Sequence, residues 1–147
     1  NRGKSRLRRV QCQTKVVVGE CVKHISGLMP MWIPSGTDVS ATAVAAACST
    51  LNRNHLQGKV VGGDLYGGVE GRYQTLVTNP PFHDGRDRTM SITRRLIEQA
   101  PRHLEEHGEF WMVANRELPY VQWLDAAFRH VQVVSETNRF RVYRALR

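Results

Sequence analysis

The stretch Asn79-Pro80-Pro81-Phe82 constrains the chain more than any other feature of its sequence. It follows a short apolar run, Leu76-Val77, that indicates the end of a buried strand. Two consecutive prolines fix the backbone angle φ and remove two amide donors, so the turn is stiff and presents carbonyl oxygens only. With the Asn79 side-chain carbonyl and the flat Phe82 ring, this turn suits a planar group that carries an NH2, such as a nucleobase amine. The alternative is ordinary turn chemistry with Phe82 in the core.

Strand and helix patterns alternate along most of the chain, apart from residues 20–36, which show no clean period. We expect strands at 15–18, 59–61, 73–78 and 109–114, and a terminal hairpin of strands at 131–134 and 140–146. We expect helices from Ser40, as an N-cap, to about 54, from Asp87 to Gly108 with a break at Pro101, and over 119–128. This order predicts an α/β fold with a mainly parallel sheet, helices on both faces and an antiparallel last strand.

Ligands of such sheets bind at the carboxyl ends of the strands, where Gly19, Asp38, Asp64 and Asn79 are expected to converge. Asp38 is the candidate for accepting hydrogen bonds from both hydroxyls of a ribose, because one carboxylate matches a vicinal diol. The alternative is that Asp38 only caps the helix that begins beside it. Asp64 is a candidate for binding an adenine amine, and equally a loop aspartate beside two glycines.

Positive charge is concentrated at the start of the chain. Residues 1–15 hold six basic and no acidic side chains, whereas the net charge of all 147 residues is +8. This leader is either an arm that neutralises nucleic-acid phosphates or a solvated tail. We expect residues 1–14 to be an irregular leader and residues 15–147 to form one domain. Because the chain starts at Asn1 without a methionine, we expect it to be a fragment of a longer protein.

The cysteine, histidine and apolar patterns argue against a disulfide-rich protein, a metal-binding protein and a membrane protein. The three cysteines lack C-x-x-C spacing, which predicts free thiols in a reducing compartment. His103 and His107 have the spacing of a helical metal pair, but the sequence places no third ligand, so we expect no metal. No apolar run approaches the roughly 20 residues that cross a bilayer, so we expect no membrane association.

Four segments together resemble the carboxy-terminal catalytic domain of the small-subunit (16S) ribosomal RNA guanine-N2 methyltransferases. They are Asp38-Val39-Ser40, Asn79-Pro80-Pro81-Phe82-His83-Asp84-Gly85, residues 113–120 and residues 138–145. Their order and spacing match over about residues 37–147. The Asn-Pro-Pro-aromatic turn alone is shared with adenine-N6 DNA methyltransferases and glutamine methyltransferases. The other segments narrow the resemblance to the guanine-N2 enzymes.

The resemblance implies a Rossmann-like fold and a cytoplasmic, monomeric enzyme that transfers a methyl group from S-adenosylmethionine to a guanine amine in ribosomal RNA or the 30S subunit. Gly19, Asp38, Asp64 and Asn79 would then line the cofactor site, with Asp38 on the ribose and Asp64 beside the adenine. The Asn79 side-chain oxygen and the Pro80 carbonyl would accept the two amine hydrogens. Phe82 would stack on the base, which must leave its helix to reach the site.

Residues 15–36 depart from that family. Where its members carry an acidic residue and a glycine-rich loop after the first strand, only Gly19 is present and Val17 takes the place of the acid. One hypothesis is that residues 1–36 derive from a truncated or frame-disrupted region. Two alternative functions therefore stay open: a cofactor-deficient RNA-binding fragment, and a methyltransferase that acts on DNA adenine or protein glutamine.

Overall fold

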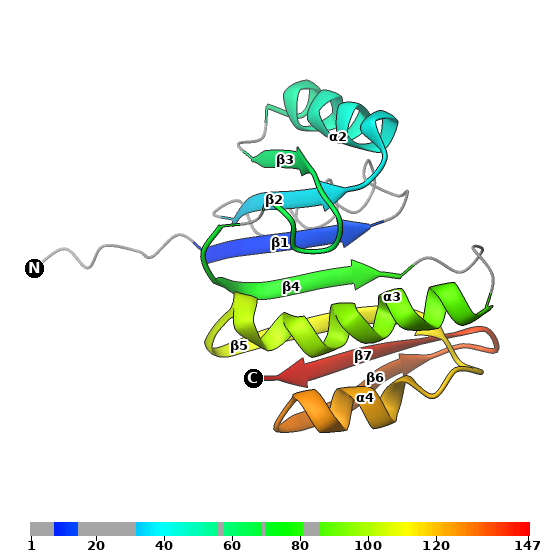
Figure 1. Cartoon of the computed structure of the whole chain (residues 1–147). Helices are drawn as coiled ribbons and strands as arrows, with labels where there is room; N and C mark the ends of the chain where they lie inside the picture. Colours follow the sequence, from blue (N-terminus) through cyan, green and yellow to red (C-terminus); the bar gives the residue numbers. More distant parts are fainter. Residues whose placement is uncertain (1–7, 15–31, 56–57, 69, 81–85) are drawn as a thin grey trace, which may run out of the picture.

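The computed structural model describes residues 8–14, 32–55, 58–68, 70–80 and 86–147. Seven strands within these ranges form one sheet in the order β3-β2-β1-β4-β5-β7-β6 (Figure 1). The strands are β1 (Arg8–Thr14), β2 (Trp32–Asp38), β3 (Lys59–Gly62), β4 (Tyr73–Asn79), β5 (Leu104–Asn115), β6 (His130–Glu136) and β7 (Phe140–Leu146). The helices are α2 (Ala41–Arg53), α3 (Arg86–Gln99), the short 3-10 helix η1 (Ala100–His103) and α4 (Tyr120–Ala127). Strands β1 to β5 pair in parallel and β7 pairs antiparallel with both β5 and β6, which confirms the predicted sheet.

Strand β1 corrects the expectation that residues 1–14 form an irregular leader. Arg8–Thr14 instead pair with β2 on one side and with β4 on the other. The many basic residues of this segment indicate an irregular leader, whereas pairing with two neighbouring strands places the segment in the sheet. Alternation of apolar and polar residues over 10–13 is the period-2 signal that indicates a strand here. The strand expected at 15–18 lies outside the described residues.

Strand β2 forms from a segment in which the sequence shows no clean period. It contains Pro34 and Gly36, which are both unfavourable inside a central strand. Pairing between β2 and β3 begins only at Ser35, so the missing amide of Pro34 interrupts no pairing with β3. Partners on both sides therefore override the local preference of this segment.

The helices begin close to where their sequence signals predict. Ser40 caps α2 by accepting a hydrogen bond from the Ala43 amide at 3.3 Å. Pro101 breaks the next helix as expected, because α3 gives way to η1 there. Gly108 does not end a helix, which corrects that prediction. It lies inside β5, where a Cβ would sit 2.9 Å from the Glu105 carbonyl oxygen, so the absence of a side chain allows a tight bend within this strand.

The buried core lies between one part of the sheet and the helices α3 and α4. Its fully buried members include side chains of β5, β7 and both helices: Ile97, Leu104, Phe110, Met112, Tyr120, Leu124 and Tyr143. Helix α2 instead packs against β2 and β3, at the other end of the sheet (Figure 1). No helix within the described ranges is both long and apolar enough to span a membrane.

His103 gives the fold a dependence on pH. Its ring stacks on Tyr66 with the ring centroids 4.3 Å apart, and burial, followed by the charge of Arg102, lowers the pKa of His103 from 6.5. The folded state therefore favours the neutral ring. The stability that the fold has with a neutral His103 is fully present above pH 6.5 and is lost as the pH falls below that value. We expect the melting temperature to drop between about pH 7 and pH 5.5. A His103→Phe variant, which keeps a ring on Tyr66, should lose less over this interval, and an equal loss in both proteins would contradict the assignment.

Candidate active site at the carboxyl edge of the sheet

The carboxyl ends of β1 to β4 lie at one edge of the sheet, and strand register places two of the predicted site residues there (Figure 1). Asn79 ends β4 and pairs with Thr14 at the end of β1. Asp38 ends β2 and pairs with Gly62 at the end of β3. Strand β1 separates β2 from β4, and strands lie about 4.8 Å apart, so the backbones of Asp38 and Asn79 are about 10 Å apart.

Asn79 carries an unused hydrogen-bond acceptor. Its Oδ1 is buried and has no partner among the described residues. A buried acceptor without a donor costs about 1–3 kcal/mol, so such a group is retained where a ligand supplies the donor. Pro80, which is buried, follows directly and offers a carbonyl but no amide. Both residues that the sequence predicts as acceptors are thus at the carboxyl end of β4.

Asp38 is buried, with 7% of its surface exposed, and its carboxylate is held in one orientation. One carboxylate oxygen, Oδ1, accepts a hydrogen bond from the Ser40 amide at 2.7 Å. The N-cap of α2 is Ser40, so Asp38 supports the turn before the helix without being the cap itself. Its backbone carbonyl accepts from the Gly63 amide at 3.1 Å, which links the ends of β2 and β3. The second carboxylate oxygen has no hydrogen bond to a described residue and is available to a ligand hydroxyl.

Asp64 lies on the turn that follows β3, with its carboxylate Oδ2 3.3 Å from an Arg95 guanidinium nitrogen on α3. Both side chains are more than half exposed, and such surface pairs contribute at most about 1 kcal/mol. Gly63 allows the turn to close, because a Cβ there would sit 2.0 Å from the Gly67 carbonyl oxygen. Asp64 thus has a protein partner, but one weak enough to be replaced by a ligand amine.

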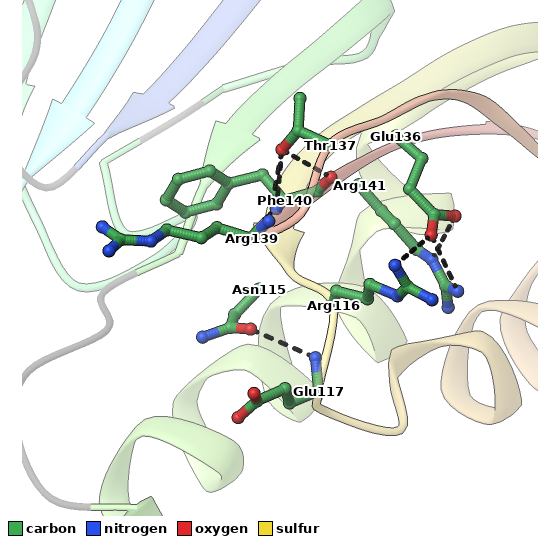
Figure 2. Close-up of polar contacts among 8 residues, drawn as sticks. All are labelled: Asn115, Arg116, Glu117, Glu136, Thr137, Arg139, Phe140 and Arg141. Atoms are coloured by element: carbon green, nitrogen blue, oxygen red, sulfur yellow. Dashed lines mark hydrogen bonds and ion pairs between the residues drawn. The ribbon is translucent and has the colours of Figure 1, made fainter.

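Asn115 is a further polar residue at this edge of the sheet, and the sequence interpretation gave it no role of its own. It ends β5, the strand next to β4, and its Oδ1 accepts a hydrogen bond from the Glu117 amide at 3.1 Å. With the oxygen engaged, the side-chain NH2 is presented on the other side (Figure 2). The available signal was an asparagine directly after an apolar strand, the same pattern that marks Asn79.

Two predicted site residues, Gly19 and Phe82, lie outside the described residues. No three His, Cys, Asp or Glu side chains gather as metal ligands within the described part of the chain. The described geometry is therefore a set of oxygen acceptors and amide donors at one sheet edge.

Residues 29–144 match the model of a family described as the methyltransferase small domain. The matched range covers more than half of the chain and includes Asp38, Asp64, Asn79 and Asn115. The chain belongs to the methyltransferase small domain family.

Two curated members of similar sequence carry the name ribosomal RNA small subunit methyltransferase C. The protein from Alcanivorax borkumensis is 63% identical over 115 residues, which cover 78% of this chain and 35% of that protein. The protein from Sodalis glossinidius is 44% identical over 137 residues, which cover 93% of this chain and 38% of that protein. This methyltransferase small domain chain therefore spans little more than a third of the length of these relatives.

Solved structures share the fold of this methyltransferase small domain. The 16S rRNA methyltransferase RsmC of T. thermophilus, solved in complex with AdoMet and guanosine, superposes with a TM-score of 0.80 at 23% identity, covering 95% of this chain and 37% of that one. A ribosomal protein L11 methylase from Lactobacillus delbrueckii gives a TM-score of 0.70 at 18% identity, covering 94% and 69%. The fold is the Rossmann-like methyltransferase fold, as the sequence resemblance implied.

Proposed function

We propose that this chain carries the methyl-transfer site of a 16S ribosomal RNA guanine-N2 methyltransferase that uses S-adenosylmethionine. The observation that carries the proposal is the buried Oδ1 of Asn79, for which no described residue supplies a donor at the carboxyl edge of the sheet. Curated relatives named ribosomal RNA small subunit methyltransferase C support it. So does the T. thermophilus enzyme of the same fold that was solved with AdoMet and guanosine.

The described residues fit the proposed cofactor. The oriented Asp38 carboxylate, with one oxygen available, suits the diol of a ribose. Asp64, about one strand further along the edge, would lie by the adenine, where an amine would replace its weak pair with Arg95. Gly19 would let the backbone approach the methionine part. S-adenosylmethionine supplies an electrophilic methyl group on sulfur.

The chain's own contribution to the chemistry is to make a poor nucleophile reactive and to aim it. The lone pair of a guanine amine is delocalised into the ring. When the Asn79 Oδ1 and the Pro80 carbonyl accept its two hydrogens, the nitrogen is favoured in a pyramidal form and its lone pair points in one direction. The rate enhancement comes from positioning and fixed dipoles, with no general base. The product amine loses its proton after the methyl transfer. Phe82 would stack on the base swung out of the RNA.

The partner is then small-subunit ribosomal RNA, alone or in the 30S subunit, and we expect a monomeric protein in the cytoplasm. The test combines calorimetric titration of S-adenosylmethionine with radiolabelled methyl transfer to naked 30S subunits, ribosomal RNA, DNA and release factor. We expect micromolar or tighter cofactor binding and label on guanine N2 in the RNA substrates only. Absence of cofactor binding would reject the proposal in favour of an RNA-binding fragment, and label in DNA or release factor would identify a different substrate class.

Asn115 is proposed to read the guanine oxygen O6. Its NH2 is a donor held in place by the Glu117 amide, and guanine offers an acceptor where adenine offers an amine. An Asn115→Asp variant keeps the bond from the Glu117 amide but loses the donor. We expect kcat/KM for RNA to fall about 10- to 100-fold.

The preference of Asn115 can be tested separately from its effect on rate. The wild type should prefer guanine over 2-aminopurine, which has the amine but no O6, at the methylated position of a substrate RNA. The Asn115→Asp variant should lose this preference. Glu117→Ala, which leaves the backbone amide intact, is the control and should keep it. A preference that survives in Asn115→Asp would contradict the proposed role.

A further inference from the structure

The turn between β6 and β7 forms an open pocket at the same edge of the sheet as the candidate active site. Its volume is about 460 Å³, and its described lining residues are Thr137, Asn138, Arg139 and Phe140, which we call the hairpin tip. Phe140 pairs with Asn115 at the end of β5, and the Arg139 carbonyl accepts from the Arg116 amide at 3.0 Å. These bonds fix the tip to the end of the strand next to β4.

Strand geometry places the tip beyond Asn79. Thr78 of β4 pairs with Met112 of β5, whereas Phe140 pairs with Asn115, about two residues further out than the level of Asn79. Two strand spacings sideways and about two residues outward separate the Asn79 and Phe140 backbones by about 12 Å. The tip is therefore placed to meet whatever lies directly beside a base held at Asn79.

The backbone of the tip is held in one shape. The Thr137 hydroxyl accepts hydrogen bonds from the Phe140 amide at 3.0 Å and from the Arg139 amide at 3.4 Å. The Thr137 amide donates to the Phe140 carbonyl at 2.8 Å. Phe140 is 41% exposed, so this ordered turn presents an aromatic surface to the solvent.

Charges at the tip are separated onto two sides (Figure 2). Arg116 and Arg141 both pair with Glu136, at 3.0 and 2.8 Å, and the Arg141 hydrogen bond is the main cause of the lowered pKa of Glu136. The Arg139 guanidinium has no ion pair within the described residues and extends with the Phe140 ring to the side on which the Asn115 NH2 lies. A positive charge that no described acidic side chain pairs with thus lies beside a partly exposed ring, next to the candidate site.

We propose that the hairpin tip binds the RNA strand next to the target guanine, with Phe140 stacked on a neighbouring base and Arg139 on a phosphate. The inference rests on the proposed function and adds the surface that holds the flanking strand. Single-stranded RNA is the occupant that fits, because unstacked bases bind to aromatic side chains and phosphates bind to arginine. Swinging the target base out unstacks its neighbour, which creates such a base at the required place.

The test compares variants of Phe140 in two assays. Binding of fluorescein-labelled single-stranded oligouridylate is followed by anisotropy without cofactor, and methyl transfer to ribosomal RNA gives KM and kcat. Phe140→Ala and Phe140→Leu should weaken RNA binding and raise KM about 10-fold or more, with kcat and cofactor affinity unchanged, whereas Phe140→Tyr should retain the wild-type values. If Phe140→Leu, which keeps apolar volume but no ring face, matches the wild type, the stacking role is wrong.

Arg139 is tested by the dependence of RNA binding on salt. Arg139→Ala should reduce the slope of log K against log salt by about one, as expected for one lost phosphate contact. Arg129→Ala removes the same charge beside the start of β6, at the opposite end of the hairpin, and should leave the slope unchanged.

The two assays separate failure of the tip from failure of the proposed function. If the wild-type protein binds RNA through Phe140 but transfers no methyl group, the RNA-binding role of the hairpin tip stands and the proposed enzymatic function is wrong. Wild-type transfer that is insensitive to Phe140 and Arg139, or wild-type protein that binds no single-stranded RNA, rejects the tip.

Discussion

Replacing Asn79 with alanine is expected to lower kcat for methyl transfer by about 100- to 1,000-fold, the loss typical when one oriented polar group is removed from a reaction centre. Cofactor affinity should stay within about twofold of the wild type, because the substitution removes the acceptor for the guanine amine and not the ribose site. Since Asn79 Oδ1 is buried and has no partner in the described part of the chain, its removal should also leave the folded state as stable or slightly more stable. Loss of activity together with retained stability is the signature of a group kept for function.

Gln74 provides a matched control for Asn79. It lies on the same strand, β4, and its Oε1 is likewise buried without a partner among the described residues, but it is remote from the carboxyl edge. Gln74→Ala should therefore change stability in a similar way and leave methyl transfer intact. For both variants, calorimetry measures cofactor affinity, single-turnover assays measure methyl transfer and thermal melts measure stability. If Asn79→Ala loses cofactor affinity as much as transfer, the acceptor role is wrong.

Replacing Asp38 has the second large effect, on cofactor binding. Asp38→Asn keeps an acceptor for the Ser40 amide at the 2.7 Å position but removes the charge and one of the two oxygens that a diol needs. A hydrogen bond to a charged group contributes about 1.5–3 kcal/mol, so we expect the Kd for S-adenosylmethionine to rise about 10- to 100-fold. Asp38→Ala, which also frees the Ser40 amide, should bind more weakly still.

Ser40→Ala separates binding by Asp38 from its support of the turn. The variant loses the N-cap of α2 and about 1 kcal/mol of stability but retains the Asp38 carboxylate. Its cofactor affinity should remain near that of the wild type. Wild-type affinity in Asp38→Asn, combined with weak binding by Ser40→Ala, would show that Asp38 has a structural role only.

Features with a local cause could be predicted from the sequence. The end of a strand at Asn79, the Ser40 cap and the break at Pro101 each follow from the chemistry of neighbouring residues, and the structure confirms the placement of all three. Strands β1 and β2 carry weaker local signals, because the short alternation in β1 stands beside several arginines and β2 contains a proline. What forms them is pairing with strands distant in the sequence, a tertiary effect that overrides local preference.

The same distinction applies to the site. Asp38 and Asn79 were predicted because each ends a strand beside a strong local signal. Asn115 and Phe140 are brought together at the same sheet edge by the antiparallel register between β5 and β7, which no short stretch of sequence specifies. Order along the chain therefore predicts which strands end at the site, and only register shows which side chains meet there.

Strand β1 connects the two halves of the candidate site, which are the Asp38 side on β2 and β3 and the Asn79 side on β4. Strands β2 and β3, which carry the cofactor side, join the rest of the sheet through β1, and the turn after β3 forms a second link where the Tyr66 hydroxyl donates to the Leu96 carbonyl at 3.0 Å. Any local opening of these links separates the ribose side from the amine side. Under the proposed function, a ligand that contacts both halves makes that opening less favourable, so we expect cofactor and RNA each to raise the affinity for the other by the same factor. Cooperativity between the two proposed substrates would then follow from the strand order, even where the two ligands never touch.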